Sequence, residues 1–312
     1  MTINGYTIIG ELTNENSGFS EWGFCYKDGR DFFIKKFLSP VYPYNDTKIS
    51  PKHKEKKIAK CKQFEERLQK MYQMIEEASD GNVVRVEEFF RHGSRYYIIT
   101  EKVQHSGLTV EQIASMPYEQ KKFLCKVVTH SIMKLHEHGF VHADIKPNNV
   151  LCKIDPQTGV FTAKVIDFDC GFFGYEPPEP DDELNGDPIY FAPECKQHMF
   201  GEEIALSCKI DVFSLGVLFH QYMTGKQPIY DTSEYDYVSE AILDDARVEI
   251  DPSIPAEFAD ILRRMLIKEP ADRIALTEVY DILAYGKHRK EPMKEELPEI
   301  YTKFKVYRGN KS

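Results

Sequence analysis

The stretch of sequence that decides the fold is His142-Ala143-Asp144-Ile145-Lys146-Pro147-Asn148-Asn149-Val150. It carries a carboxylate, an ammonium group and a carboxamide at fixed offsets in one short loop. Residues 119–138 precede it with the apolar face of a helix, which Gly139 is expected to end, and the strand-like run Val150-Leu151-Cys152 follows. Aspartate, lysine and asparagine are each common in turns, so the significance of this loop lies in their spacing.

Length and composition limit the class of protein. A chain of 312 residues with 42% hydrophobic residues can bury a large core, as one two-lobed domain or as two domains. Its 29% charged residues, with only 18 glycines and 17 prolines, argue against disorder over most of the length. The net charge of -10 predicts no nucleic-acid partner, because phosphate contacts need a basic surface.

Cysteine usage and hydropathy favour a cytoplasmic location. The seven cysteines are scattered and form no Cys-x-x-Cys pair, which favours a reducing compartment over a disulfide framework or a zinc site. Residues 1–6 show no basic segment followed by an apolar one, and no apolar run approaches the ~20 residues of a membrane span. We therefore expect a cytoplasmic protein without a membrane partner, while no pattern in the chain defines its oligomeric state.

The N-terminal third has the pattern of strands around one helix. Aromatic and β-branched residues predict five strands, at Tyr6–Leu12, Trp22–Lys27, Asp31–Phe37, Val83–Phe90 and Arg95–Thr100. Asp28-Gly29, between the second and third strands, is a hairpin signal because both positions tolerate positive φ. An apolar stripe at spacings of three and four predicts a helix over residues 54–77, formed by Ile58, Cys61, Phe64, Leu68, Met71 and Ile75.

The loop at His142 resembles the catalytic loop of protein kinases, usually His-Arg-Asp-Leu-Lys-Pro-Glu-Asn, with Ala143 in place of the arginine. Four later segments resemble other motifs of that family. They are Asp167-Phe168-Asp169 for Asp-Phe-Gly, Gly186 to Glu194 for Gly-Thr-x-x-Tyr-x-Ala-Pro-Glu, Asp211 to Val217 for the start of the central helix, and Glu269 to Arg273 for Asp-Pro-x-x-Arg. The resemblance implies that Glu194 pairs with Arg273 and that Asp211 anchors the backbone of the catalytic loop.

The resemblance also implies which residues carry out phosphoryl transfer. Asp144 would hydrogen-bond the attacking hydroxyl, and Lys146 would stabilise the γ-phosphate. Asn149 and Asp167 would be the ligands of Mg2+. Asp144, Lys146 and Asp167 are therefore the expected catalytic residues. Lysine at the Lys146 position is the form of the loop found in Ser/Thr kinases.

Weaker matches suggest nucleotide-binding residues in the N-terminal third. Phe33-Ile34-Lys35 resembles Ala-Ile-Lys, in which the lysine contacts the α- and β-phosphates of ATP and pairs with a helix glutamate. We expect Lys35 rather than Lys36 in this role, because the family motif places the lysine after the apolar pair. Glu65 is the expected helix partner because it gives the better register, with Glu66 as the alternative.

Two further segments are expected to contact ATP. Thr13 to Glu21 occupies the place of the phosphate-covering loop, with Gly18 as its only glycine. Taken alone, this stretch is more typical of an ordinary polar hairpin loop. Thr100-Glu101-Lys102-Val103 resembles the hinge between kinase lobes, where the Glu101 carbonyl and the Val103 amide would bond adenine.

Three departures from the family pattern concern activation. Ala143 cannot bind a phosphate on the activation segment as the family's arginine does, and residues 170–185 contain no serine or threonine, only Tyr175. We infer a kinase that does not depend on phosphorylation of this segment. Asp169 stands where a glycine usually lets the segment flip, which predicts a stiffer switch.

A further departure is Asp187, which stands where the family usually has threonine. Two interpretations are open. Its carboxylate could pair with Lys146 while repelling Asp144, which would raise an aspartate pKa in the cluster. Alternatively, Asp187 simply caps a turn before Pro188.

These features predict an α+β, two-lobed protein-kinase fold. We expect an N-lobe of five antiparallel strands and one helix at residues 1–100, a hinge at 101–107, a mainly helical C-lobe at 108–285 and a tail at 286–312. The expected reaction transfers the γ-phosphoryl group of ATP to a Ser or Thr hydroxyl of a protein substrate. A pseudokinase acting as a nucleotide-responsive binding or scaffold module is the alternative. A small-molecule kinase is disfavoured by Ala192-Pro193-Glu194 and Arg273.

Overall fold

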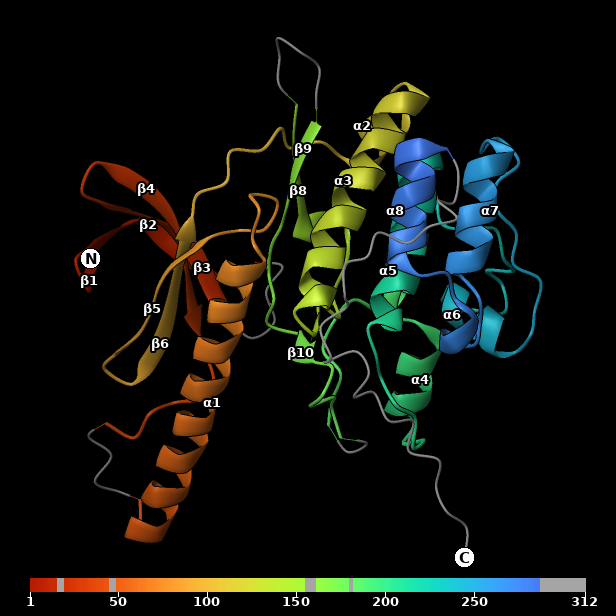
Figure 1. The fold of residues 1–312 in the computed structure, drawn as a ribbon. Helices are drawn as coiled ribbons and strands as arrows, with labels where there is room; N and C mark the ends of the chain where they lie inside the picture. The colour runs from red at the N-terminus through yellow and green to blue at the C-terminus, as the bar shows by residue number, and fades with distance from the viewer. Residues whose placement is uncertain (16–19, 45–48, 155–160, 180–181, 287–312) are drawn as a thin grey trace, which may run out of the picture. The chain divides into compact units, whose positions relative to one another are not determined.

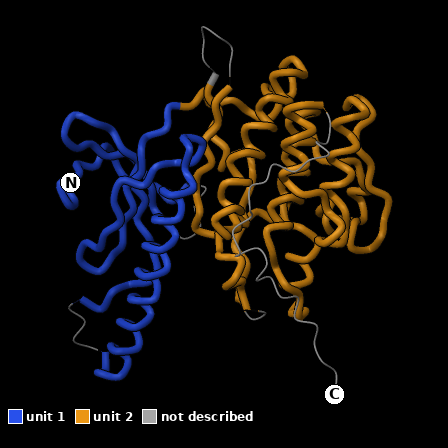
Figure 2. Tube along the Cα trace, in the orientation of Figure 1, with its two compact units in different colours: residues 1–104 blue, residues 105–312 orange. Residues whose placement is uncertain are grey.

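The computed structural model describes residues 1–15, 20–44, 49–154, 161–179 and 182–286 (Figure 1). The chain divides into two compact units, residues 1–104 and residues 105–312 (Figure 2). The division falls inside residues 101–107, where the hinge is expected.

Unit 1 is built on one antiparallel sheet in the order β1-β2-β3-β4-β6-β5. The strands are β1 (Thr2–Ile3), β2 (Tyr6–Thr13), β3 (Ser20–Lys27), β4 (Arg30–Phe37), β5 (Val86–His92) and β6 (Arg95–Glu101). All five predicted strands are present, and the two-residue β1 adds a sixth. Asp28 and Gly29 form the predicted hairpin turn with φ of 50° and 82°. β5 begins three residues later than expected, because its continuous pairing with β6 starts at Val86, while the buried Val83 forms only an isolated bridge.

Each face of this sheet buries a different set of side chains. On one face, a core cluster joins Ile3, Tyr6, Cys25, Phe32, Ile34, Tyr97 and Ile99. The other face packs against α1 (Pro51–Ala78), where Phe64 contacts the rings of Phe37 and Tyr96 at centroid distances of 5.3 and 5.2 Å. The helix begins three residues before its predicted start, because Ser50 caps it and Pro51 suits its first turn.

Unit 2 is mainly helical, as predicted. Its helices are α2 (Val110–Ala114), α3 (Tyr118–Glu137), α4 (Pro193–Met199), α5 (Lys209–Thr224), α6 (Val238–Leu243), α7 (Ala256–Met265) and α8 (Leu276–Tyr285), with short 3-10 turns at Pro147–Asn149, Pro188–Tyr190 and Pro270–Asp272. Two small antiparallel pairs join β8 (Val150–Ile154) to β9 (Phe161–Val165) and β7 (Phe140–Val141) to β10 (Phe172–Phe173).

Helix α5 forms the core of unit 2. Almost every residue from Ile210 to Met223 is buried, which confirms the expectation of a helix that is apolar on all sides. Gly216 lets α5 approach Met265 and Leu266, since a Cβ there would lie 3.0 Å from each side chain. Gly225 ends α5 in the left-handed conformation, with φ of 78°. Throughout the described ranges, the helices are too short or too polar for any of them to cross a bilayer.

Candidate active site

The loop at His142 gathers three of the expected site residues around one carboxylate. Lys146 Nζ lies 2.8 Å from Asp144 Oδ2 and 3.1 Å from Oδ1. Asn149 Nδ2 donates to Asp144 Oδ2 at 2.9 Å and to the Asp144 carbonyl at 2.7 Å. The Asp187 N–H donates to Asp144 Oδ1 at 3.0 Å. Three donors therefore fix the orientation of Asp144, whose residue is buried.

The backbone of this loop is held from beneath by helix α5. Asp211 is fully buried and accepts the N–H groups of His142 at 2.8 Å and of Ala143 at 2.9 Å. The Nε2 atom of His136, near the end of α3, lies 2.8 Å from Asp211 Oδ2. The expected anchoring role of Asp211 is confirmed. It holds Ala143 at a φ of 62°, a left-handed conformation that alanine adopts only at a cost.

Strand pairing brings Asp167 beside the same loop. β8 and β9 are in register from Val150 opposite Val165, and the Ile166 N–H donates to the Asn149 carbonyl at 3.0 Å. The carbonyl of Ile166 lies 3.1 Å from His142 Nε2. Asp167 follows directly, with φ of 63°. This positive φ at a non-glycine residue is a local strain of the kind that clusters at functional sites.

Cys170 shows that the carboxylates converge on one place. Burial above all, and then the nearby charges of Asp144, Asp167 and Asp169, raise the pKa of its thiol to about 12. The charges of Asp144, Asp167 and Asp169 therefore all act on the thiol of the half-buried Cys170. All seven cysteine thiols of the chain are free.

The electrostatics of Lys146 follow from its neighbours. Burial by itself would lower the pKa of Lys146, but the hydrogen bond and charge of Asp144, with a further contribution from Asp187, raise it above its ordinary value. Lys146 therefore carries its positive charge at neutral pH.

The residues at this site fit a magnesium ion. Because the amide nitrogen of Asn149 bonds Asp144, its oxygen is turned to the other side, and it accepts no hydrogen bond within the described part of the chain. Amide and carboxylate oxygens are ligands that Mg2+ accepts. Asn149 and Asp167 together offer both types.

Asp187 is a turn cap in this structure. Its Oδ1 accepts the Ile189 N–H at 3.1 Å at the start of the 3-10 turn that begins with Pro188. Of the two interpretations left open by the sequence, the structure shows the cap. Within the described residues, the Asp187 carboxylate forms no ion pair with Lys146. Its charge contributes only to the raised pKa of Lys146.

The segment that follows Asp167 is held by backbone pairing. β10 pairs with β7, and the Gly174 N–H donates to the Gly139 carbonyl at 2.8 Å. Gly171 is required here, because a Cβ would overlap the Phe140 ring. Phe168 is buried, with its ring 5.2 Å from that of His142. Asp169 does not have a positive φ, so this backbone does not need the glycine that the family has there.

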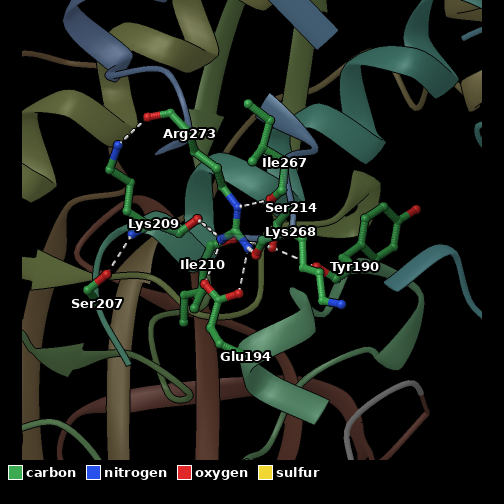
Figure 3. A network of polar contacts seen from close by, with 9 residues as sticks. All are labelled: Tyr190, Glu194, Ser207, Lys209, Ile210, Ser214, Ile267, Lys268 and Arg273. Carbon is green, nitrogen blue, oxygen red and sulfur yellow. Dashed lines mark hydrogen bonds and ion pairs between the residues drawn. The ribbon is translucent and has the colours of Figure 1, made fainter. Parts of the chain in front are cut away.

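The predicted pair of Glu194 and Arg273 is confirmed (Figure 3). Arg273 donates to the two oxygens of Glu194 at 2.6 Å each, and both side chains are almost fully buried. Its other three N–H groups donate to the carbonyls of Ile267 (2.7 Å), Lys268 (2.8 Å) and Lys209 (2.9 Å). Every donor of the guanidinium is therefore used, which joins α4, α5 and the loop after α7.

In unit 1, Lys35 lies on the face of the sheet that packs against α1. Side chains alternate along β4, so Lys35 shares this face with Phe37, which contacts α1. Glu65 turns toward the same face, where Tyr96 Oη donates to Glu65 Oε1 at 2.6 Å. Glu66 is exposed and pairs with Lys62 on its own helix. These positions favour Glu65 over Glu66.

The structure also places the alternative lysine and the expected hinge residues, but not the glycine of the covering loop. Lys36 is on the opposite face from Lys35 and pairs with Glu21 at 2.7 Å. At the end of β6, the backbone N–H of Glu101 donates to the Arg85 carbonyl at 3.0 Å, and its carboxylate accepts the Arg85 N–H at 2.8 Å. Val103 lies just beyond β6 and is half-buried. Gly18 lies outside the described residues.

Two residues to which the sequence assigns no role also shape this site. His136 is the buried partner of Asp211, and only its position in the last turn of the helix before the loop could have indicated it. Gly186 lies against the loop, where a Cβ would be 2.7 Å from the Phe191 ring and 3.2 Å from the Ala143 carbonyl. Glycine at 186 therefore allows the Asp187 N–H to reach Asp144.

Comparison with known proteins agrees with this geometry. The calcium-dependent protein kinase 14 of Arabidopsis thaliana is 27% identical over 205 residues, which cover 64% of this chain and 37% of that protein. The serine/threonine-protein kinase ssp1 of Schizosaccharomyces pombe is 26% identical over 290 residues, which cover 89% of this chain and 42% of that protein. The chain thus spans about two fifths of the length of these relatives. The protein kinase domain model matches residues 45–282, so the chain belongs to the protein kinase domain family.

Proposed function

We propose that this chain is a Ser/Thr protein kinase that transfers the γ-phosphoryl group of ATP to a protein hydroxyl with Mg2+. The observation that carries the proposal is the cluster of Asp144, Lys146 and Asn149. In this cluster, the ammonium group of Lys146 and the amide of Asn149 both hold the carboxylate of Asp144, which would face the hydroxyl of the substrate. The Ser/Thr preference is supported by lysine at 146 and by the similarity to the serine/threonine-protein kinase ssp1.

Each residue of the cluster has a role that follows from its contacts. Asp144 is oriented to accept a hydrogen bond from the attacking hydroxyl of the substrate. Lys146, charged at neutral pH, stabilises negative charge on the transferred group. Mg2+ bound by Asn149 and Asp167 would neutralise phosphate charge. In unit 1, Lys35 would contact the α- and β-phosphates with Glu65 as its partner, and Gly18 would belong to the covering loop.

We assign the adenine contacts to the backbone at the end of β6, through the Glu101 carbonyl and the Val103 amide. The N-lobe would then comprise residues 1–100, the hinge 101–107 and the C-lobe 108–285, with the tail from 286 lying almost wholly outside the described residues. The seven free thiols are in keeping with a reducing, cytoplasmic location.

The proposed kinase would not depend on phosphorylation of residues 170–185. Ala143 offers no cation for a phosphate, and its N–H is already bonded to Asp211. The pairing of β10 with β7 and the bond from Asp187 to Asp144 hold the two ends of the segment without a phosphate. Phosphatase treatment followed by a rate assay tests this proposal. Unchanged activity is expected, also in Tyr175→Phe, and loss of activity after dephosphorylation would contradict it.

The central experiment measures transfer of radiolabelled phosphate from ATP to the chain itself and to generic acceptor proteins. Asp144→Asn keeps the shape of the side chain but removes its charge, and we expect about 10²–10⁴-fold slower transfer. Asp167→Ala should abolish Mg2+-dependent transfer. Asp260→Asn, an exposed position on α7, is the matched control and should leave the rate unchanged. Phosphoamino acid analysis should show phosphoserine or phosphothreonine.

The same assay separates the proposal from its alternative. A pseudokinase would show equal background transfer in the wild type, Asp144→Asn and Asp167→Ala. That result would refute catalysis by this site. Calorimetric titration with Mg-ATP would then establish whether the chain still binds the nucleotide.

A further inference from the structure

The phenol of Tyr96 joins the sheet of unit 1 to helix α1. Tyr96 lies in β6, and its Oη donates to Oε1 of Glu65 at 2.6 Å. Its side chain is fully buried and packs against the rings of Phe64, at a centroid distance of 5.2 Å, and Phe89, at 6.0 Å. Glu65 itself is half-buried. A short hydrogen bond from a buried, packed ring therefore fixes this carboxylate relative to the sheet.

The phenol keeps its proton in this position. Burial above all, and then the hydrogen bonds with Glu65 and Cys61, raise the pKa of Tyr96 well above its ordinary value. Tyr96 is therefore a neutral hydrogen-bond donor throughout the physiological pH range. Cys61 lies four residues before Glu65 on α1, so the two side chains share one face of the helix and the phenol meets two consecutive turns.

The strand register places Tyr96 near Lys35, on the face of the sheet that packs against α1. In the pairing of β4 with β6, Phe37 is opposite Tyr96 and Lys35 is opposite Ile98. Lys35 and Tyr96 are therefore diagonal neighbours on one face, and such residues lie roughly 7–8 Å apart. Long side chains span this separation. A carboxylate bonded to Tyr96 is thus within reach of the ammonium group of Lys35.

Glu65 can serve both partners at once. A carboxylate has two oxygens, so Glu65 can accept the phenol of Tyr96 on one and the ammonium group of Lys35 on the other. The proposed function needs Lys35 to point at the phosphates, with Glu65 as its partner. A glutamate bound to Lys35 alone would move with the lysine. The bond to Tyr96 ties both side chains to the rigid part of the sheet.

We propose that Tyr96 is a positioning residue that holds Glu65, and through it Lys35, ready for the phosphates of ATP. This inference rests on the proposed function and deepens it. Tyr96 belongs to none of the family motifs found in the sequence, so the role comes from a side chain particular to this chain. Because the carboxylate is ordered before ATP arrives, binding does not have to order it, and the phosphates bind more tightly.

The variant Tyr96→Phe tests this role, because it removes the hydroxyl and keeps the ring that packs against Phe64 and Phe89. Binding of ATP, ADP and adenosine to the intact chain is measured by calorimetry in the presence of Mg2+. We expect about tenfold weaker binding of ATP and ADP, as for the loss of a hydrogen bond to a charged group. Adenosine has no phosphates, so its affinity should not change.

The variant Tyr97→Phe is the matched control. It makes the same chemical change one residue farther along β6, on the opposite face of the sheet, where Tyr97 belongs to the core cluster. The affinities for all three ligands should stay at the wild-type values. A general loosening of unit 1 would weaken the binding of adenosine and ATP alike, so the comparison of the two ligands separates positioning from stability.

A double-variant cycle tests whether Tyr96 acts through Glu65. Glu65→Gln alone should weaken ATP binding, because its amide offers Lys35 no negative charge. Adding Tyr96→Phe to Glu65→Gln should then weaken ATP binding by less than about twofold, since the two changes affect one contact. A full further tenfold loss would show that the phenol acts elsewhere, and it would overturn the inference.

The outcomes separate this inference from the proposed function. Equal ATP affinity in the wild type and in Tyr96→Phe, or an equal loss of affinity for adenosine, would overturn the inference. Phosphoryl transfer that depends on Asp144 would in that case leave the kinase proposal intact. If the wild type binds no ATP and transfers no phosphate, both proposals are wrong.

Discussion

Replacing Asp211 by asparagine should damage the catalytic loop without touching any group that meets the substrate. Asp211 is fully buried and accepts the N–H groups of His142 and Ala143 on its two oxygens. Asparagine has the same shape but only one oxygen, so one of these N–H groups would face an NH2 group. Asp211→Asn should therefore lower the free energy of unfolding by about 2–4 kcal/mol, the range for an unpaired buried donor beside a lost charged acceptor.

The loss of activity should exceed what the loss of stability explains. Ala143 is held at a φ of 62°, which costs an L-residue about 1–2 kcal/mol relative to its right-handed conformation. Without its acceptor, Ala143 is free to relax, and the adjacent Asp144 moves with it. A displacement of about 1 Å at a reacting group costs roughly 100-fold in rate, so kcat should fall by about that factor.

A second substitution should partly reverse this effect. Glycine adopts positive φ without strain, so Ala143→Gly in the Asp211→Asn background should recover about 1 kcal/mol of the barrier, or about fivefold in kcat. Urea unfolding followed by circular dichroism gives stability, and radiolabelled transfer at saturating ATP gives kcat. Asp260→Asn is the exposed control. If Asp211→Asn costs less than about 1 kcal/mol, the smallest expected for an orphaned N–H, or if glycine gives no recovery, the anchoring argument is wrong.

Three further predictions concern unit 2. Glu194→Gln should cost about 3–5 kcal/mol in urea unfolding, because it leaves the buried charge of Arg273 unpaired, and a cost near zero would contradict the network. Gly171→Ala should cost about 1–3 kcal/mol and slow transfer, because its Cβ overlaps the Phe140 ring; wild-type activity would refute this. Burial lowers the pKa of His220, so its contribution to stability is present above the unfolded pKa near 6.5 and is lost as pH falls below it, by at most about 1.4 kcal/mol per pH unit. A smaller slope in His220→Gln between pH 5 and 6.5 would support this, and an equal slope would exclude His220 as its source.

The sequence could predict the catalytic loop because its chemistry is local. Asp144, Lys146 and Asn149 lie within six residues, and one short turn brings their side chains together. The buried pair of Glu194 and Arg273 could also be predicted, since each half belongs to its own motif. The five predicted strands and the helix of unit 1 could be predicted from their hydrophobic periods, because each period extends over several turns or several alternations.

Other features left no readable pattern. β7 and β10 have two residues each, which is too short for any periodicity, and their pairing is non-local. The bond between His136 and Asp211 joins residues 75 positions apart. Val83 and Val84 carry the apolar pattern of a strand because both are buried, while the continuous ladder begins only with β5. In each case the missing information is a tertiary contact.

Backbone contacts at Ala143 stand where the family has an arginine side chain. Its backbone, not its side chain, joins the catalytic loop to its surroundings: the N–H bonds Asp211, and the carbonyl lies against Gly186. Because Gly186 has no Cβ, the next N–H, that of Asp187, reaches Asp144 at 3.0 Å. The link from the end of the segment to the catalytic carboxylate therefore consists of backbone atoms and a glycine. Under the proposal that activity does not depend on phosphorylation of residues 170–185, this backbone link takes the place of the link between a phosphate and an arginine.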